Sequence, residues 1–292
     1  MSLDAERTVE ALVEVVRTMI EPRVGAAALV EARDLVAAVL GEPRFWPSLH
    51  GAEMVEHQVV EAVCSAARRR AKGAPFAYAV RQAAFRYLTL GVDQRVLIPR
   101  QETEVLVDLI LAAPQHVPGA TAADVGTGSG AIALALATEG KFGRVIATDI
   151  STDALAVAAT NVQRLCARLT ARVELRAGDA LRPLIGTSVD VLVSNPPYIA
   201  FAEAPELPAL VRDWEPPQAL VCPEDGLAVT RAIVQQARAI VRPGGLLAFE
   251  VDSRRAHRVA EMVQATGAFD QTEVHPDLTG RDRFVLATRN TR

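Results

Sequence analysis

Residues 189–198 read Val189-Asp190-Val191-Leu192-Val193-Ser194-Asn195-Pro196-Pro197-Tyr198. The first five are rich in β-branched side chains and form a run too short for a typical helix, so they predict a buried parallel strand. Each proline fixes φ and lacks an N–H, so the strand must end there and leave Asn195 at the carboxyl end of a sheet. Ligands of open α/β sheets bind at that edge.

The residues after this strand suit the binding of a planar NH2 group. The Asn195 side-chain oxygen and the Pro196 carbonyl can each accept one hydrogen, which fixes the plane of the nitrogen. Tyr198 offers a flat face for an amide or a base. We therefore expect methylation of an amide or exocyclic amine, with Asn195, Pro196 and Tyr198 as catalytic residues and Pro197 beside them in the substrate site. The alternative is a plain strand-ending turn, since Asn and Pro are common in turns.

Strand-like and helix-like segments alternate through residues 101–292, as in a doubly wound α/β domain. This pattern predicts a Rossmann-like fold whose sheet has seven mostly parallel strands and helices on both faces. Strands are expected near Ala122–Val125, Arg144–Thr148, Arg172–Arg176, Val189–Val193, Leu246–Val251, Thr272–His275 and Phe284–Thr288.

Apolar residues at helical spacing predict a small bundle over residues 1–73, with a role in substrate recognition or as a scaffold. Its first helix is expected to stop at Pro22. Residues 74–100 predict a β-hairpin linker, built from the short apolar pieces Phe76–Val80, Phe85–Leu90 and Val96–Ile98. The basic cluster Arg68–Lys72 ends the third helix, where cations complement the helix dipole and face solvent. A contact with RNA or an acidic partner is the alternative.

A glycine-rich loop follows the first predicted strand of the α/β domain. Gly126-Thr127-Gly128-Ser129-Gly130 leads into a helix, where the backbone can approach a ligand closely and free N–H groups face it. Asp149 closes the next strand, where a carboxylate can accept the ribose hydroxyls of an adenosyl group. Asp179 and Ala180 follow the third strand, where an acid can hold the adenine amine; a turn residue is the alternative for Asp179. The loop also fits a relaxed dinucleotide fingerprint, so an NAD enzyme is a competing interpretation.

Composition narrows the possibilities further. The 292 residues are 50% hydrophobic and 23% charged, with a net charge of −4 that disfavours broad nucleic-acid affinity. Three separated cysteines and five histidines show no metal-ligand spacing, so no metal is expected. Acidic residues near the start, including Asp4 and Glu6, are wrong for a secretory signal, and no apolar run has the length of a membrane span. We therefore expect a soluble, cytoplasmic protein.

Together these motifs resemble the HemK/PrmC family of protein N(5)-glutamine methyltransferases. The resemblance rests on the segments already quoted and on Val96–Arg100, Glu102–Glu104, Trp214–Pro216, Glu224–Gly226, Arg242–Gly245 and Leu278–Asp282. It implies methyl transfer from S-adenosylmethionine to the glutamine of the Gly-Gly-Gln motif in peptide chain release factors. It also implies that Asn195–Tyr198 hold the glutamine. The cofactor residues implied are Gly126, Thr127, Gly128, Ser129, Gly130, Asp149, Asp179, Ala180 and Asn195, with Thr103 near the methionine end.

Two positions depart from the family pattern. Gln101 stands where proline is usual, and Ala180 stands where a large aromatic often flanks the adenine. Three alternatives remain at this stage: an N(6)-adenine nucleic-acid methyltransferase, a glutamine methyltransferase acting on a ribosomal protein, and a catalytically silent ribosome- or factor-binding module. The net negative charge and the lack of an evident base-reading domain oppose the first of these, and the intact glycine loop opposes the last.

Overall fold

A computed structural model describes residues 7–223 and 225–291. Asp4, Glu6 and Glu224, which entered the sequence-based expectations, lie outside the described residues. The chain divides into two compact units. One holds the described residues up to Gln82 together with Ala209–Trp214, and the other holds those of Ala83–Pro208 and Glu215–Arg292.

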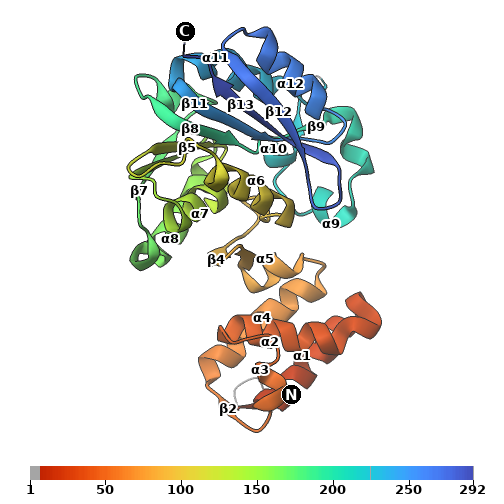
Figure 1. Cartoon of the computed structure of the whole chain (residues 1–292). Helices are drawn as coiled ribbons and strands as arrows, with labels where there is room; N and C mark the ends of the chain where they lie inside the picture. The colour runs from red at the N-terminus through yellow and green to blue at the C-terminus, as the bar shows by residue number, and fades with distance from the viewer. Residues whose placement is uncertain (1–6, 224, 292) are drawn as a thin grey trace. The chain divides into compact units, whose positions relative to one another are not determined.

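The first unit is helical and has its own apolar core (Figure 1). Its elements are β1 (Arg7–Thr8), α1 (Val9–Val24), η1 (Gly25–Ala27), α2 (Ala28–Leu40), α3 (Trp46–Leu49), β2 (Met54–Val55), α4 (His57–Ala71), α5 (Phe76–Val80) and α9 (Ala209–Arg212). The expected stop at Pro22 is wrong, because α1 continues to Val24 and ends at Gly25, whose φ is +64°. Proline fixes φ at a helical value, so the helix can pass through Pro22, although the missing N–H and the crowding of the carbonyl four residues earlier carry a cost.

The basic cluster does end α4, but two of its arginines are engaged within the unit. Arg69 Nε donates to the Ala79 carbonyl at 2.9 Å, and Arg70 pairs with Glu31. Burial lowers the pKa of Arg69. A fully solvated turn is therefore the wrong description of these two side chains.

The predicted hairpin forms from two short strands, β3 (Gln82–Phe85) and β4 (Leu88–Gly91). The expectation for Phe76–Val80 was wrong, because this segment is the helix α5. A five-residue apolar run does not distinguish a strand from a helix, and here Pro75 at the N-cap and two alanines favour the helix. Val96–Ile98 is not a strand either.

The second unit is built on a seven-stranded sheet in the order β12-β13-β11-β8-β5-β6-β7. All neighbouring pairs are parallel except those of β13. The strands are β5 (Thr121–Val125), β6 (Arg144–Asp149), β7 (Arg172–Ala177), β8 (Val189–Ser194), β11 (Val241–Glu250), β12 (Phe269–Pro276) and β13 (Asp282–Arg289). The predicted fold class is confirmed, and each strand overlaps its predicted range.

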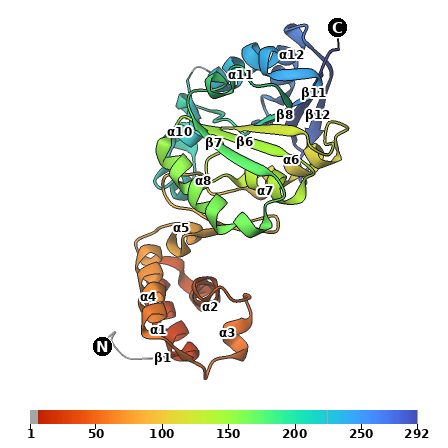
Figure 2. The same ribbon diagram turned by 90° about the vertical axis from the view of Figure 1, so that its left-hand side faces the viewer.

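Helices cover both faces of this sheet (Figures 1 and 2). One apolar core lies under α6 (Gln101–Ala112), α7 (Ala131–Glu139) and α8 (Thr152–Arg164), and the other lies under α11 (Ala228–Ile240) and α12 (Ala256–Ala265). The short elements are η2 (Cys166–Arg168), η3 (Arg182–Leu184), β9 (Ile199–Ala200), η4 (Phe201–Glu206), α10 (Pro217–Leu220) and β10 (Val221–Cys222). Within residues 7–223 and 225–291, no helix is both long and apolar enough to cross a membrane.

Candidate active site

The carboxyl ends of two neighbouring strands meet at one edge of the sheet. Val125 of β5 lies opposite Ser194 of β8, and the Ser194 hydroxyl donates to the Val125 carbonyl at 2.7 Å. The glycine loop and Asn195 therefore begin at the same level. A cavity of about 520 Å³ opens there, lined by Arg95, Val96, Leu97, Val125, Gly126, Gly128, Thr148, Asp149, Ile150, Ser151, Ala154, Gly178, Asp179, Ala180, Ser194, Asn195, Pro196, Pro197, Phe201, Pro217, Gln218, Ala219, Val221 and Val229.

The glycine loop adopts a backbone that other residues resist. Gly126, Gly128 and Gly130 have φ values of +76°, +56° and +85°, in the left-handed region that favours glycine. A Cβ at Gly126 or Gly128 would meet no atom within 4 Å, so the space in front of these two glycines is open. Both line the cavity, which leaves room for a ligand against the bare backbone.

Other loop residues support the loop from behind and do not line the cavity. The Thr127 hydroxyl donates to Asp124 Oδ2 at 2.6 Å, and the Ala133 N–H donates to the same oxygen at 3.1 Å. Asn161 of α8 donates from Nδ2 to the carbonyls of Ser129 and Gly91, both at 2.9 Å. Burial raises the pKa of Asp124 to about 7. Thr127 and Ser129 thus fix the shape of the loop from the side away from the cavity.

Asp149 ends β6 and faces the cavity with a fixed carboxylate. Its Oδ2 accepts the Gly128 N–H and its Oδ1 accepts the Ser151 N–H, each at 2.9 Å. Burial raises its pKa, and these backbone hydrogen bonds oppose that shift. The Ile150 N–H acts on the same carboxylate, which has about four acceptor sites in all. The Asp149 carboxylate can therefore accept a hydroxyl hydrogen from a ligand.

Asp179 and Ala180 form the next wall of the cavity. Ala180 has a φ of +46°, and the Asp179 carbonyl accepts the Arg182 N–H at 3.0 Å, so a turn is present here. In the described part of the chain, no hydrogen bond or ion pair engages the Asp179 carboxylate. The turn interpretation and the ligand interpretation of Asp179 are therefore compatible.

Asn195 lies at the cavity with its side-chain nitrogen held from behind. Asn195 Nδ2 donates to the hydroxyl of Thr103, a buried residue in the first turn of α6, at 3.3 Å. Pro196 and Pro197 line the same wall. With Nδ2 engaged, the Asn195 oxygen is the atom left to accept a hydrogen from a ligand.

Tyr198 is not among the residues that line the cavity, so its contact with a substrate remains a prediction. Burial raises the pKa of its hydroxyl to about 12, and the nearby Glu250 carboxylate adds to this shift. The Tyr198 backbone packs tightly, because a Cβ on Gly226 would lie 2.4 Å from the Tyr198 carbonyl oxygen. Close approach of Gly226 therefore fixes the end of the Asn-Pro-Pro-Tyr segment.

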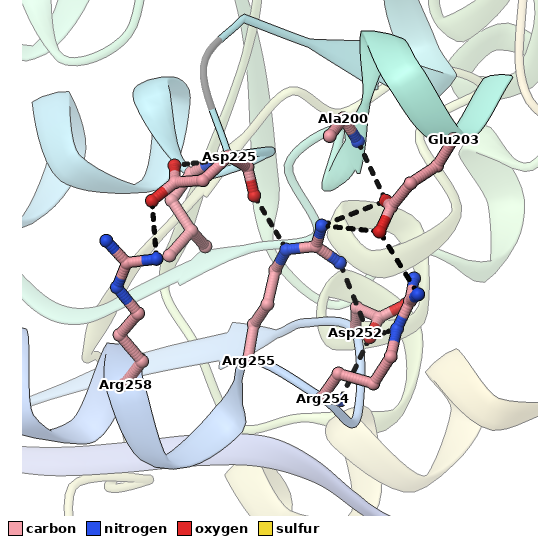
Figure 3. Close-up of polar contacts among 8 residues, drawn as sticks. Ala200, Glu203, Asp225, Asp252, Arg254, Arg255 and Arg258 are labelled. Atoms are coloured by element: carbon pink, nitrogen blue, oxygen red, sulfur yellow. Dashed lines mark hydrogen bonds and ion pairs between the residues drawn. The ribbon is translucent and has the colours of Figure 1, made fainter.

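A network of charges fixes the wall that follows Tyr198 (Figure 3). β9 pairs with β10, and Glu203 of η4 accepts the Ala200 N–H at 3.0 Å. Arg255 at the start of α12 donates to both Glu203 oxygens at 2.8 and 2.9 Å and to the Asp225 carbonyl at 2.7 Å. This arginine therefore links η4, the segment before α11, and α12. Phe201, in this wall, lines the cavity.

Sequence reasoning missed several residues of the site. Ile150 and Phe201 line the cavity although 66% and 58% exposed, and no local pattern distinguishes such apolar residues from others. Glu215 was noted only within a family motif, yet it is buried and pairs with Arg100 at 2.5 Å. Glu250 carried no sequence signal at all.

Comparison with known proteins agrees with this architecture. Residues 101–207 match the family described as methyltransferase small domain. A methyltransferase from Pyrococcus furiosus has a similar structure, with a TM-score of 0.52 at 15% identity, over 71% of this chain and 91% of that one. That likeness shows the fold alone.

Sequence relatives give the family. The release factor glutamine methyltransferase of Moorella thermoacetica is 48% identical over 76% of this chain and 77% of its own length. The protein of the same name from Clostridium acetobutylicum is 36% identical over 89% of this chain and 90% of its own length. Fold and site thus define a methyltransferase. The chain belongs to the release factor glutamine methyltransferase family, and the resemblance to HemK/PrmC proteins is confirmed.

Proposed function

We propose that this protein transfers a methyl group from S-adenosylmethionine to the side-chain amide nitrogen of the glutamine in the Gly-Gly-Gln motif of peptide chain release factors. The observation that carries the proposal is the shared edge of β5 and β8, which brings the glycine loop and Asn195 to one cavity. The family of the chain supports both the reaction and the acceptor.

The residues at the cavity fit an adenosyl group. Gly126 and Gly128 leave open space, and the carboxylates of Asp149 and Asp179 have acceptor capacity for hydroxyls and an amine. When bound, S-adenosylmethionine supplies the methyl group: the amide nitrogen bonds to its carbon as the carbon–sulfur bond breaks, sulfur keeps the electron pair, and the nitrogen releases one proton to water.

The chain contributes position more than reactivity. The Asn195 oxygen and the Pro196 carbonyl accept the two amide hydrogens and thereby orient the nitrogen toward the cofactor side of the cavity. Positioning of this kind supplies most of the rate in transfers that need no activated base. In this proposal Tyr198 backs the substrate side, and the cofactor's methionine end lies toward Thr103.

The first, helical unit is proposed to recognise the release factor, as residues 1–73 were expected to do, with 74–100 as the linker to the catalytic domain. Such a role needs a protein partner and places the enzyme in the cytoplasm with the translation apparatus. Hydrogen exchange of the full chain tests it, because addition of a release factor should then protect amides in α1, α2 or α4. Protection confined to the second unit would contradict it.

Mass spectrometry tests the reaction. The full chain is incubated with S-adenosylmethionine and a release factor, and the peptide containing Gly-Gly-Gln is analysed. We expect a gain of one methyl group on the glutamine and no binding of duplex DNA at low salt. No gain, with the cofactor bound by calorimetry, would reject the acceptor while leaving the methyl donor in place.

A further inference from the structure

Glu250 is a buried carboxylate beside the site that the mechanism above does not use. It is the last residue of β11, and its side chain is almost fully buried, with the residue 1% exposed. In the described part of the chain its Oε2 has no hydrogen-bond partner. A buried acid without full pairing is costly and therefore unusual.

The register of the sheet places Glu250 next to Asn195. Phe249 of β11 lies opposite Ser194 of β8 in a parallel pair, so the residues that follow them leave the sheet side by side. Thr103 connects the two side chains. Its hydroxyl accepts from Asn195 Nδ2 at 3.3 Å, and its interaction with the Glu250 carboxyl lowers the pKa of that acid, although burial dominates and raises it to about 7.

The single hydrogen of the Thr103 hydroxyl decides which of Asn195, Thr103 and Glu250 donates and which accepts in these contacts. A threonine hydroxyl has one hydrogen, so if it accepts from Asn195 its own hydrogen must go elsewhere. An ionised Glu250 can only accept, and therefore takes that hydrogen. A protonated Glu250 can instead donate its hydrogen to the Thr103 hydroxyl oxygen. The Thr103 hydrogen can then be donated to the Asn195 side-chain oxygen, which requires the Asn195 amide group to flip.

We propose that Glu250 is a positioning residue that, through Thr103, keeps the Asn195 side-chain oxygen directed at the substrate amide. The proposal rests on the function proposed above, because the orientation of Asn195 matters only for an acceptor NH2 group. Ionised Glu250 favours the productive orientation, and protonated Glu250 favours the reverse one. Activity should therefore rise with pH through the ionisation of this residue.

Several charged groups act on Glu250 and enter its pH response. Arg283 of β13 and Arg100 before α6 favour the ionised form, whereas Glu102 in α6 favours the protonated one. Tyr198 is electrostatically coupled to Glu250 and Asp252. All of these remain in a Glu250→Gln variant, so the difference between the variant and the parent isolates Glu250.

The test combines kinetics with a spectroscopic measurement. Glu250→Gln should lower kcat for release-factor methylation about tenfold, the effect of one hydrogen bond to a charged group, and flatten its rise with pH. The affinity for S-adenosylmethionine should stay unchanged. Thr103→Val should lower kcat and flatten its pH profile to the same extent, whatever its effect on cofactor affinity, and Thr103→Ser should restore activity. Glu174→Gln, which removes a carboxylate on β7 far along the sheet order, is the matched control.

NMR of the 15N-labelled asparagine side chains gives a result that does not depend on turnover. The Asn195 amide signal, assigned by its loss in Asn195→Ala, should shift with pH in the parent and not in Glu250→Gln. An Asn195 signal that titrates equally in both, or an unchanged kcat and pH profile in Glu250→Gln and Thr103→Val, would overturn the inference. Absence of methylation by the parent, with the Asn195 titration present, would instead reject the proposed acceptor.

Discussion

Asn195 makes its hydrogen bonds at the point where the chain can no longer pair with a neighbouring strand. Its nitrogen is held by Thr103, and the proline that follows it is buried. The backbone of Asn195 and Pro196 is thus fixed at the end of β8, and the Thr103 contact selects the orientation of the Asn195 amide. The activity proposed for this chain therefore depends on the Asn195 side chain, which is ordered when the protein folds and not when the substrate binds.

Replacement of Asn195 by alanine should separate binding from turnover. Loss of a polar anchor in a transfer site typically lowers kcat by at least about a hundredfold. The glycine loop and Asp149 remain, so binding of S-adenosylmethionine should be largely intact. Calorimetry and a turnover assay check this, with thermal unfolding as the control for folding. Normal turnover in Asn195→Ala would rule out the role given to this residue.

Gly226 offers a second test at the same scale. Its φ is +81°, and an added Cβ would lie 2.4 Å from the Tyr198 carbonyl oxygen, so Gly226→Ala must displace the segment around Tyr198. We expect a loss of about 1 to 3 kcal/mol in unfolding free energy from overpacking, together with reduced turnover.

Gly186→Ala is the matched control for that change. Gly186 has a similar φ of +77°, but a Cβ there meets nothing within 4 Å. It should lower stability by about 1 kcal/mol through backbone strain and leave turnover unchanged. Equal turnover in the two variants would show that the contact with Tyr198 is unimportant.

At the scale of elements, the wall between β9 and β10 depends on its connection to α12. Arg255→Ala removes the hydrogen bonds to Glu203 and to the Asp225 carbonyl (Figure 3). We expect a loss of about 2 kcal/mol in stability, since the lost bonds involve a charged, half-buried group. Amides in η4 should exchange faster, and KM for the release factor should rise.

Arg258→Ala tests whether the loss of any positive charge in α12 has the effects expected for Arg255→Ala. Arg258 pairs with Asp225 at 2.6 Å but is 58% exposed, and exposed pairs contribute about 0–1 kcal/mol. Its exchange pattern and KM should match those of the parent. A similar rise in KM for Arg255→Ala and Arg258→Ala would argue against a specific role for Arg255.

Elements also show how far the sequence could be interpreted. Strands such as β8 were predictable because β-branched runs ended by glycine or proline have few other readings. The secondary structure of Phe76–Val80 was not predictable, since a run of five apolar residues fits either a strand or a helix. Glu250 could not be found at all. Its importance comes from the pairing of β11 with β8 between residues distant in sequence, and no local pattern encodes that register.

For the whole molecule, buried acids with raised pKa values, Asp124 and Glu250 among them, contribute to the response of stability to pH. The pKa values of Asp124 and Glu250 are raised to about 7 in the folded protein from ordinary values of 3.8 and 4.5. Between these limits the folded state binds more protons than the unfolded state. Their contribution to stability is therefore full below the ordinary pKa values and is lost as pH rises to about 7.

Other carboxylates act in the opposite direction at lower pH. Ion pairing with Arg144 and neighbouring arginines lowers the pKa of Glu174 to about 2, so its contribution is lost as pH falls below about 4.5. For these three groups the unfolding free energy should therefore be greatest near pH 4. Denaturant titrations across this range check it. Glu250→Gln should reduce the decline between pH 4.5 and 7 without abolishing it, because Asp124 remains. An unchanged decline would contradict the assignment.

The separate attachment of the cavity's two sides has an evolutionary consequence. The glycine loop and Asp149 extend from β5 and β6, whereas the opposite wall belongs to the segment between β8 and α11, which Arg255, Arg254 and Arg100 hold by ion pairs. Mutations in residues 199–208 and 215–222 can thus change this wall without altering the glycine loop or Asp149. During evolution, such enzymes can acquire new targets through changes in the segment between β8 and α11 while the rest of the domain is kept.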